Sequence, residues 1–215
     1  MITNNIIKRF FTSILLLVIL YFALINNGIL ILTLFSIIYI LLIEFNYIFK
    51  KMFNKNKLFN FLFLFTALTY LIFFSLLIFI FLQDNNQSSK QKIIFILSIC
   101  ISTDLGGYLF GKLFKGKKLT SLSPNKTYSG MIGSFFLSLI VASIFFKNLE
   151  LEVNIFLLTL IISFVSQIGD LFISLFKRKA KIKDTGKILP GHGGLLDRLD
   201  GILFAIPVGL FLVSL

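Results

Sequence analysis

Residues 58–82, LFNFLFLFTALTYLIFFSLLIFIFL, form a run of 25 residues that contains no charged side chain. A membrane-spanning helix needs roughly 17–25 mostly apolar residues, so this run is long enough to cross with some tilt. A re-entrant pair is the alternative, but two halves of about 12 residues would each be too short to cross the bilayer. We therefore predict one transmembrane helix here.

Comparable apolar runs occur throughout the chain of 215 residues. Hydrophobic residues make up 57% of it and charged residues 14%, well below the roughly 25% charged of an average soluble protein. No small-residue cleavage site follows the first run, so we expect it to be retained and not removed as a signal peptide. The composition predicts an all-α, polytopic membrane protein with about seven transmembrane helices, at residues 10–25, 28–49, 58–82, 93–110, 130–146, 154–176 and 201–215.

The net charge of +12 has a membrane explanation. If the N-terminus lies in the cytoplasm, the inner segments hold 18 of the 21 Lys and Arg residues, and the outer segments hold Lys90, Lys92 and Lys147. This asymmetry follows the positive-inside rule and places the loops 112–129 and 177–200 in the cytoplasm. Because these loops account for the charge and no stacked-aromatic nucleic-acid module is visible, we exclude nucleic acid as a partner.

Two acidic residues fall within predicted transmembrane helices near the cytoplasmic side. Asp104 lies eight residues before Lys112, and Asp170 lies seven residues before Lys177. In regular helices these spacings put the two acids about 12 and 10 Å below the cytoplasmic surface of the membrane. An intramembrane carboxylate is costly and usually marks a site or a polar cavity, although an ion pair with a lysine is the structural alternative. We predict that the two acids share one polar pocket. A polar stripe runs along the helix of the second acid, at Gln167, Asp170, Ser174 and Lys177.

Gly106 and Gly107 follow Asp104 in the same predicted helix. Two adjacent glycines would let the helix break, or would let another backbone approach it closely. Both alternatives stay open on the sequence.

The basic loop 112–129 ends in the sequence Ser-Pro-Asn-Lys-Thr at residues 123–127. Ser123 followed by Pro124 is typical of an N-cap with proline at the first helical position. The same arrangement would point free backbone N–H groups at an anion, and Lys126 would add a full charge. The two interpretations are compatible.

The second basic loop, 177–200, combines cations, carboxylates and the sequence Pro-Gly-His-Gly-Gly at 190–194. The glycines let the backbone approach a ligand closely, and Asp197 and Asp200 share a helical face. These acids could simply complement the dipole of the helix that they begin. Together with Asp170 beside so many cations, however, they are typical of Mg²⁺ held between a protein and a triphosphate.

These residues resemble the phosphatidate cytidylyltransferase family, the CDP-diacylglycerol synthases. The family pattern is S-x-x-K-R-x4-K-D, a short gap, and P-x-H-G-G-x-x-D-R-x-D, and residues 174–200 match every fixed position. The segments at residues 104–108, 123–127 and 169–170 also look like segments of this family, so the resemblance covers roughly residues 100–203. Ser129 and Ile173 stand where the family often has Glu, and the chain is shorter than is usual.

The resemblance implies transfer of a cytidylyl group from CTP to phosphatidic acid, giving CDP-diacylglycerol and diphosphate for phospholipid synthesis. It implies Mg²⁺, with a second cation left open, held by Asp170, Asp197 and Asp200. The catalytic residues expected are Asp170, Lys177, Arg178, Lys183, Asp184, Asp197 and Arg198. The substrate-binding residues expected are Asp104, Ser123, Asn125, Lys126, Thr127, Ser174, His192, Gly193 and Gly194.

We interpret His192 as a residue that positions the ligand and not as a metal ligand or an obligatory general base. It has no second His or Cys at metal-ligand spacing, and Mg²⁺ prefers oxygen ligands. The attacking phosphatidate oxygen is already anionic near neutral pH, so no proton must be removed before attack.

Two other functions are open alternatives. A CTP-dependent lipid-alcohol kinase of the polyprenol type would use similar parts, but it would transfer the terminal phosphate and release CDP. A transporter would place polar residues along a path through both leaflets, whereas the acids here lie near the inner face.

We expect residues 1–92 to form an N-terminal scaffold of three helices, in which Glu44 is the only charge within the spans, and residues 93–215 to form the catalytic region. The implied location is a bacterial-type inner or cell membrane, with the N-terminus and the active-site loops in the cytoplasm. The expected partners are CTP, phosphatidic acid and the lipid bilayer. Three properties stay open: the preferred acyl chain, the choice between CTP and dCTP, and the oligomeric state, for which a homodimer is one alternative.

Overall fold

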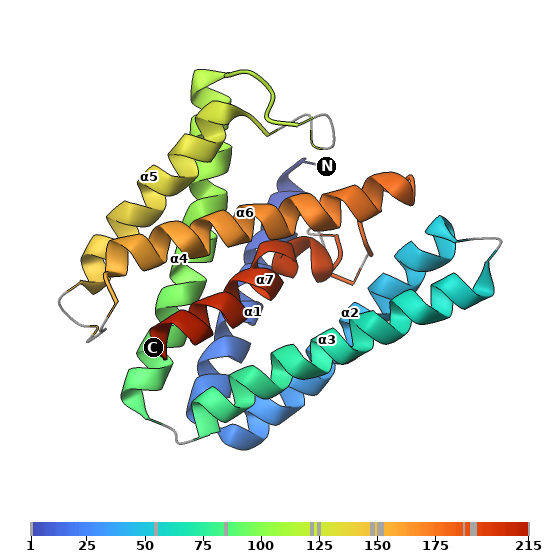
Figure 1. Ribbon diagram of the computed structural model, residues 1–215, viewed down its shortest axis with the longest axis horizontal. Coiled ribbons are helices and arrows are strands. Elements are labelled where there is room, and N and C mark those ends of the chain that lie inside the picture. The colour runs from blue at the N-terminus through green and yellow to red at the C-terminus, as the bar shows by residue number, and fades with distance from the viewer. Residues whose placement is uncertain are drawn as a thin grey trace. The chain divides into compact units, whose positions relative to one another are not determined.

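The computed structural model describes residues 2–53, 56–83, 86–120, 123, 126–146, 149, 153–186, 188–189 and 193–214. Within these ranges the regular structure is helical apart from isolated β-bridges, and each predicted apolar run coincides with one helix (Figure 1). The all-α prediction is therefore confirmed. The helices are α1 (Ile2–Ile25), α2 (Asn27–Met52), α3 (Lys57–Gln83), α4 (Gln87–Phe114), α5 (Tyr128–Phe145), α6 (Ile155–Lys179) and α7 (Leu196–Val213).

Five of the helices, α2 to α6, are long and apolar enough to cross a membrane. The apolar part of α1, Phe10–Ile25, is shorter, and α7 begins with the charged residues Asp197, Arg198 and Asp200. Helix α3 runs without a break, so the prediction of one span at residues 58–82, and not a re-entrant pair, is confirmed. Five such helices indicate an integral membrane protein.

The chain divides into two compact units, and helices α6 and α7 contribute residues to both. The first unit comprises residues 1–86 and 176–199, and the second comprises residues 87–175 and 200–215. The loop between α6 and α7 thus belongs to the same unit as the first three helices. The expected division at residues 92 and 93 concerned function and stays a prediction.

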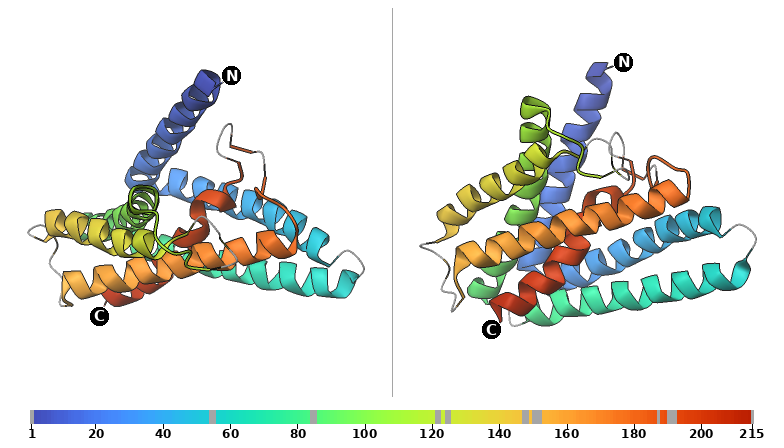
Figure 2. Two further views of the ribbon diagram at one scale, coloured as in Figure 1. Left: turned by 90° about the horizontal axis from the view of Figure 1, so that it is seen from above. Right: turned by 45° about the horizontal axis from the view of Figure 1, so that its top comes forward.

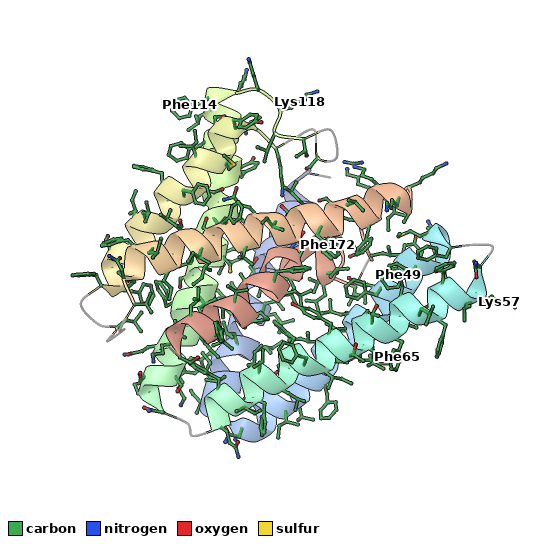
Figure 3. All side chains as sticks on the ribbon, in the orientation of Figure 1. Phe49, Lys57, Phe65, Phe114, Lys118 and Phe172 are labelled. Atoms are coloured by element: carbon green, nitrogen blue, oxygen red, sulfur yellow. The ribbon has the colours of Figure 1, made fainter. Side chains whose placement is uncertain are left out.

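In the first unit, α2 and α3 lie side by side (Figure 1, Figure 2). Asn26 caps α2, and its side chain accepts hydrogen bonds from two backbone N–H groups of the first turn. Phe49, labelled in Figure 3, is buried and contacts the rings of Phe63 on α3 and Phe176 at the end of α6. Because lipid tails are as apolar as these side chains, the packing rests mainly on van der Waals contact.

In the second unit, α4 and α5 pack so closely that glycine is required between them (Figure 2). A Cβ atom on Gly106 would overlap the carbonyl oxygen of Gly133, and one on Gly130 would lie 2.8 Å from the carbonyl oxygen of Gly107. The Ser134 hydroxyl donates to the Thr103 carbonyl at 2.7 Å across the same contact. Of the two alternatives for Gly106 and Gly107, close approach of another backbone is confirmed, since α4 does not break.

Candidate active site

The loop between α6 and α7 is closed by an ion pair between its two ends. Lys177 lies in the last turn of α6, and Asp197 lies in the first turn of α7. The Lys177 Nζ is 2.8 Å from Asp197 Oδ1, and the two side chains are 16% and 10% exposed. Such low exposure makes this pair less screened than a surface salt bridge. Two residues of the predicted catalytic set are therefore in direct contact.

The second oxygen of Asp197 accepts hydrogen bonds from the backbone inside the loop. Asp197 Oδ2 accepts hydrogen bonds from the backbone N–H groups of Thr185 at 2.8 Å and Gly194 at 3.1 Å. Burial by itself raises the pKa of Asp197, but the hydrogen bond from Lys177, the Thr185 N–H, the Lys177 charge and the Gly194 N–H outweigh it. The net pKa is lowered, so the carboxylate stays ionised at neutral pH.

A second acid of this cluster, Glu44 of α2, was missed by the sequence interpretation, which assigned α2 to the scaffold. Glu44 is 1% exposed, and its Oε1 accepts a hydrogen bond from the Leu195 N–H at 2.8 Å. Its Oε2 accepts from the Leu196 N–H and lies within hydrogen-bond distance of the Thr185 hydroxyl, both at 2.8 Å. The signal available in the sequence was a lone carboxylate inside three apolar helices, which usually marks a polar site.

Two glycines of the predicted motif are explained by this cluster. Gly193 has a φ of +87°, in the region that favours glycine. A Cβ atom on Gly194 would overlap the Thr185 hydroxyl and lie 2.6 Å from Glu44 Oε2. The glycines thus allow the loop to fold against two carboxylates.

In the second unit, the structure brings two other predicted residues, Lys126 and Ser174, into contact with Asp170. Lys126 Nζ lies 2.5 Å from Asp170 Oδ2, and the Ser174 hydroxyl donates to Asp170 Oδ1 at 3.3 Å. The side chains of Lys126 and Asp170 are 26% and 28% exposed, so a ligand can reach them. An ion pair with a lysine was the structural alternative for the intramembrane acids. Asp170 forms such a pair, and its partner is Lys126 of the loop before α5.

The predicted N-cap of α5 is wrong. Helix α5 begins at Tyr128, and its cap is Thr127, whose side chain accepts a hydrogen bond from the Gly130 N–H at 3.1 Å. Ser123 lies four residues before Thr127, and its backbone N–H donates to Thr120 Oγ1 at 3.2 Å. Thr127 has the extended backbone of a cap, with φ of −122° and ψ of 157°. The free N–H groups of α5 therefore follow Thr127 and not Ser123.

The remaining predicted residues are distributed over both units. Arg178, Lys183, Asp184 and Arg198 are exposed residues of the first unit. In the second unit, Asp104 is exposed on α4, and Asp200 is 8% exposed with its Oδ1 accepting from the Gly201 N–H at 2.9 Å. Asn125 and His192, as well as Pro124 and Pro190, lie outside the described residues. A pocket shared by Asp104 and Asp170 stays a prediction.

The chemistry of the three proposed metal ligands fits Mg²⁺, which prefers oxygen. Within the described residues of either unit, no three Asp, Glu, His or Cys side chains form a metal-binding group. Asp197 Oδ1 contacts Lys177 and Asp170 Oδ1 contacts Ser174, and a carboxylate offers about four lone-pair positions in all. These oxygens therefore keep lone pairs that could bind a cation, and the convergence of Asp170, Asp197 and Asp200 stays a prediction.

Comparison with known proteins identifies the family of this chain. The model of the Cytidylyltransferase family matches residues 1–215. The chain belongs to this family. The resemblance seen in residues 174–200 is thereby confirmed, and the match extends to the first three helices, which resembled the family only in character.

Similar proteins include the phosphatidate cytidylyltransferase of Staphylococcus aureus, which is 45% identical over 134 residues, 60% of this chain and 52% of that protein. The phosphatidate cytidylyltransferases of Staphylococcus epidermidis and Staphylococcus saprophyticus are each 40% identical over 134 residues, with the same coverage. The chain thus spans about half the length of the curated relatives that it matches.

Proposed function

We propose that this protein transfers the cytidylyl group of CTP to phosphatidic acid, releasing diphosphate and forming CDP-diacylglycerol for phospholipid synthesis. The observation that carries the proposal is the ordered cluster of Lys177, Thr185, Gly194 and Asp197 in the loop that matches the family pattern. Family membership supports cytidylyl transfer, and the similarity to phosphatidate cytidylyltransferases supports a phosphatidate acceptor.

The reaction needs no covalent intermediate on the protein. An anionic phosphate oxygen of phosphatidic acid attacks the α-phosphorus of CTP, and the bond from that phosphorus to the bridging oxygen breaks, so that diphosphate leaves. Transfers of this kind depend on positioning and on neutralisation of charge. Lys177, Arg178, Lys183 and Arg198 would supply the positive charge that stabilises the departing diphosphate.

The structure supports preorganisation of two of the positive charges involved. Lys177 and Lys126 are each held by a carboxylate, at 2.8 and 2.5 Å. Charges that are fixed before the reaction cost no reorganisation during it. Lys126 would then contribute to substrate binding with Asp104, Ser123, Asn125, Thr127, Ser174, His192, Gly193 and Gly194.

Asp170, Asp197 and Asp200 would hold Mg²⁺, with a second cation left open. Bound there, the ion would neutralise charge on the triphosphate of CTP. Asp184 is proposed as a further catalytic residue on the exposed side of the loop. His192 is proposed to position a CTP phosphate by a hydrogen bond, alongside backbone N–H groups of the glycine-rich segment.

The proposal is tested with purified protein, CTP, Mg²⁺ and phosphatidic acid, by mass spectrometry of the lipid product. The expected result is a lipid heavier than phosphatidic acid by one cytidine monophosphate unit less water. A parallel reaction with a polyprenol acceptor tests the kinase alternative. A phosphorylated polyprenol together with unchanged phosphatidic acid would contradict the proposal.

The proposed orientation, with both basic loops in the cytoplasm, is tested by thiol labelling in intact cells. Lys179 is exposed at the end of α6, and the native Cys100 is buried, so Lys179→Cys in a Cys100→Ala background presents one reactive thiol. We expect no labelling by a membrane-impermeant reagent until the cells are opened.

The matched control is Gln87→Cys in the same background, because Gln87 is also exposed and lies at the start of α4, in a predicted outer segment. It should label in intact cells. Labelling of Lys179→Cys from outside, with protection of Gln87→Cys, would reverse the orientation.

A further inference from the structure

Glu44, which lies on α2, holds the loop between α6 and α7 by hydrogen bonds to three loop residues. Thr185 lies in the middle of the loop, and Leu195 and Leu196 lie at its end, where α7 begins. All three direct a hydrogen-bond donor at the Glu44 carboxylate, with donor–acceptor distances of 2.8 Å. The Glu44 carboxylate therefore ties the middle of the loop to its end, as Asp197 also does through the Thr185 and Gly194 N–H groups.

The Leu195 and Leu196 N–H groups are among those that a helix leaves without an internal partner at its N-terminus. An anionic acceptor at this end of a helix is favourable, because the helix dipole is positive there. Glu44 thus performs, from a distant helix, the role that a local cap usually performs. Glu44 is only 1% exposed, so water does not compete for these hydrogen bonds.

Thr185 links Glu44 to the proposed metal ligand. Its hydroxyl oxygen lies 2.8 Å from Glu44 Oε2 and 3.0 Å from Asp197 Oδ2, while its backbone N–H donates to Asp197 Oδ2. A hydroxyl has one proton, so it can donate to only one of the two carboxylates at a time. The backbone bond holds Thr185 to Asp197 in either case.

Two glycines of the loop lie directly against the Glu44 carboxylate. A Cβ atom on Gly186 would lie 2.8 Å from Glu44 Oε1, and one on Gly194 would lie 2.6 Å from Oε2. The glycine-rich segment between these two residues contains the predicted ligand-binding positions. The loop backbone is therefore in contact with Glu44 on both sides of that segment.

We infer that Glu44 of α2 is a positioning residue of the reaction: through Thr185, Leu195 and Leu196 it holds the α6–α7 loop, and with it Asp197, in the geometry that catalysis requires. It touches neither substrate nor metal in this account. The activity measurements below rest on the proposed function, but the loop measurement does not.

Glu44→Gln is the central variant, because it keeps the size of the side chain. Whichever way its amide is turned, an NH₂ group faces a backbone N–H that Glu44 now accepts from, so at least one bond is lost. We expect kcat and kcat/KM for CTP to fall together by about 10²-fold, the loss produced by a misplacement of about 1 Å.

Two Thr185 variants test the link to the loop. Thr185→Ser keeps the hydroxyl and should retain near-normal kcat, whereas Thr185→Val removes it at similar volume and should lower kcat. Because Glu44 and Thr185 share one contact, the double variant Glu44→Gln with Thr185→Val should lose less than the product of the two single losses.

The matched control is Ser75→Ala on α3. Ser75 is also a buried polar residue of the first unit, and its hydroxyl has no hydrogen-bond partner among the described residues. This variant should leave kcat unchanged.

Amide hydrogen exchange of the purified protein provides the readout that does not depend on the substrate. In Glu44→Gln, exchange should quicken in residues 183–196 and stay unchanged in α4 and α5. Normal kcat in folded Glu44→Gln, or faster exchange throughout the chain without selectivity for residues 183–196, would overturn the inference. If the wild-type protein makes no CDP-lipid, the proposed function fails, and the exchange pattern alone decides the role of Glu44.

Discussion

Asp197→Asn is expected to lower kcat by several orders of magnitude while the protein still inserts and folds. The carboxylate holds the Lys177 ammonium at 2.8 Å with one oxygen and two loop N–H groups with the other. An amide supplies one acceptor oxygen and no charge, so it can neither balance Lys177 nor bind Mg²⁺ as a carboxylate does. The variant would lose positioning and charge neutralisation together, the two effects on which phosphoryl chemistry depends.

The measurement is a comparison of kcat, kcat/KM and the Mg²⁺ dependence of the two proteins. The matched control is Lys179→Gln, which neutralises an exposed charge of the same region without a predicted catalytic role. It should change kcat little. Near-normal turnover in Asp197→Asn would remove Asp197 from the catalytic machinery.

The lowered pKa of Asp197 also has a sign that can be checked. The pKa of Asp197 in the folded protein lies below the ordinary carboxyl value. The ionised carboxylate therefore contributes fully to folding stability at any pH above that ordinary value. This contribution is lost as the pH falls through the lowered folded pKa. Asp197 should therefore cause no loss of activity or stability between neutral pH and the ordinary carboxyl range.

Gly106→Ala is expected to lower the stability of the second unit substantially. Its Cβ atom would overlap the Gly133 carbonyl oxygen and lie 2.9 Å from the Gly133 carbonyl carbon and from Ser134 Cα. These are backbone atoms, so α4 and α5 would have to move apart. Overpacking of this kind costs typically about 1–3 kcal/mol, and occasionally more. The effect is measured as the midpoint of thermal unfolding in detergent.

Gly111→Ala is the matched control, because it makes the same change on the same helix. There the nearest atom to the new Cβ is the Thr127 hydroxyl at 3.2 Å, a side-chain atom. It should unfold close to the wild-type temperature. Equal unfolding temperatures for the two variants would show that the α4–α5 contact is less close than described.

The helices were predictable because bilayer thickness fixes their length. The run at residues 58–82 became the continuous helix α3, and the glycine pair in α4 marked a close backbone contact. Both follow from physical limits that act locally: the distance across a bilayer, and the space that a side chain occupies.

The site was predictable only in part. Lys177 and Asp197 are 20 positions apart and belong to one motif, so both were predicted as site residues, but their ion pair was not predicted. Glu44 was missed because its partners lie more than 140 residues further along the chain. Thr127 and Ser123 are both good caps by residue type, and the backbone of the folded loop decides between them.

The most direct test of the central claim is a reaction with CTP labelled separately in its α- and γ-phosphates. The purified protein is given phosphatidic acid and Mg²⁺, and the label is followed in the lipid and in the aqueous products. Cytidylyl transfer predicts that the α-label enters the lipid and that the γ-label leaves in diphosphate. Entry of the γ-label into lipid, with the α-label kept in CDP, would contradict the account.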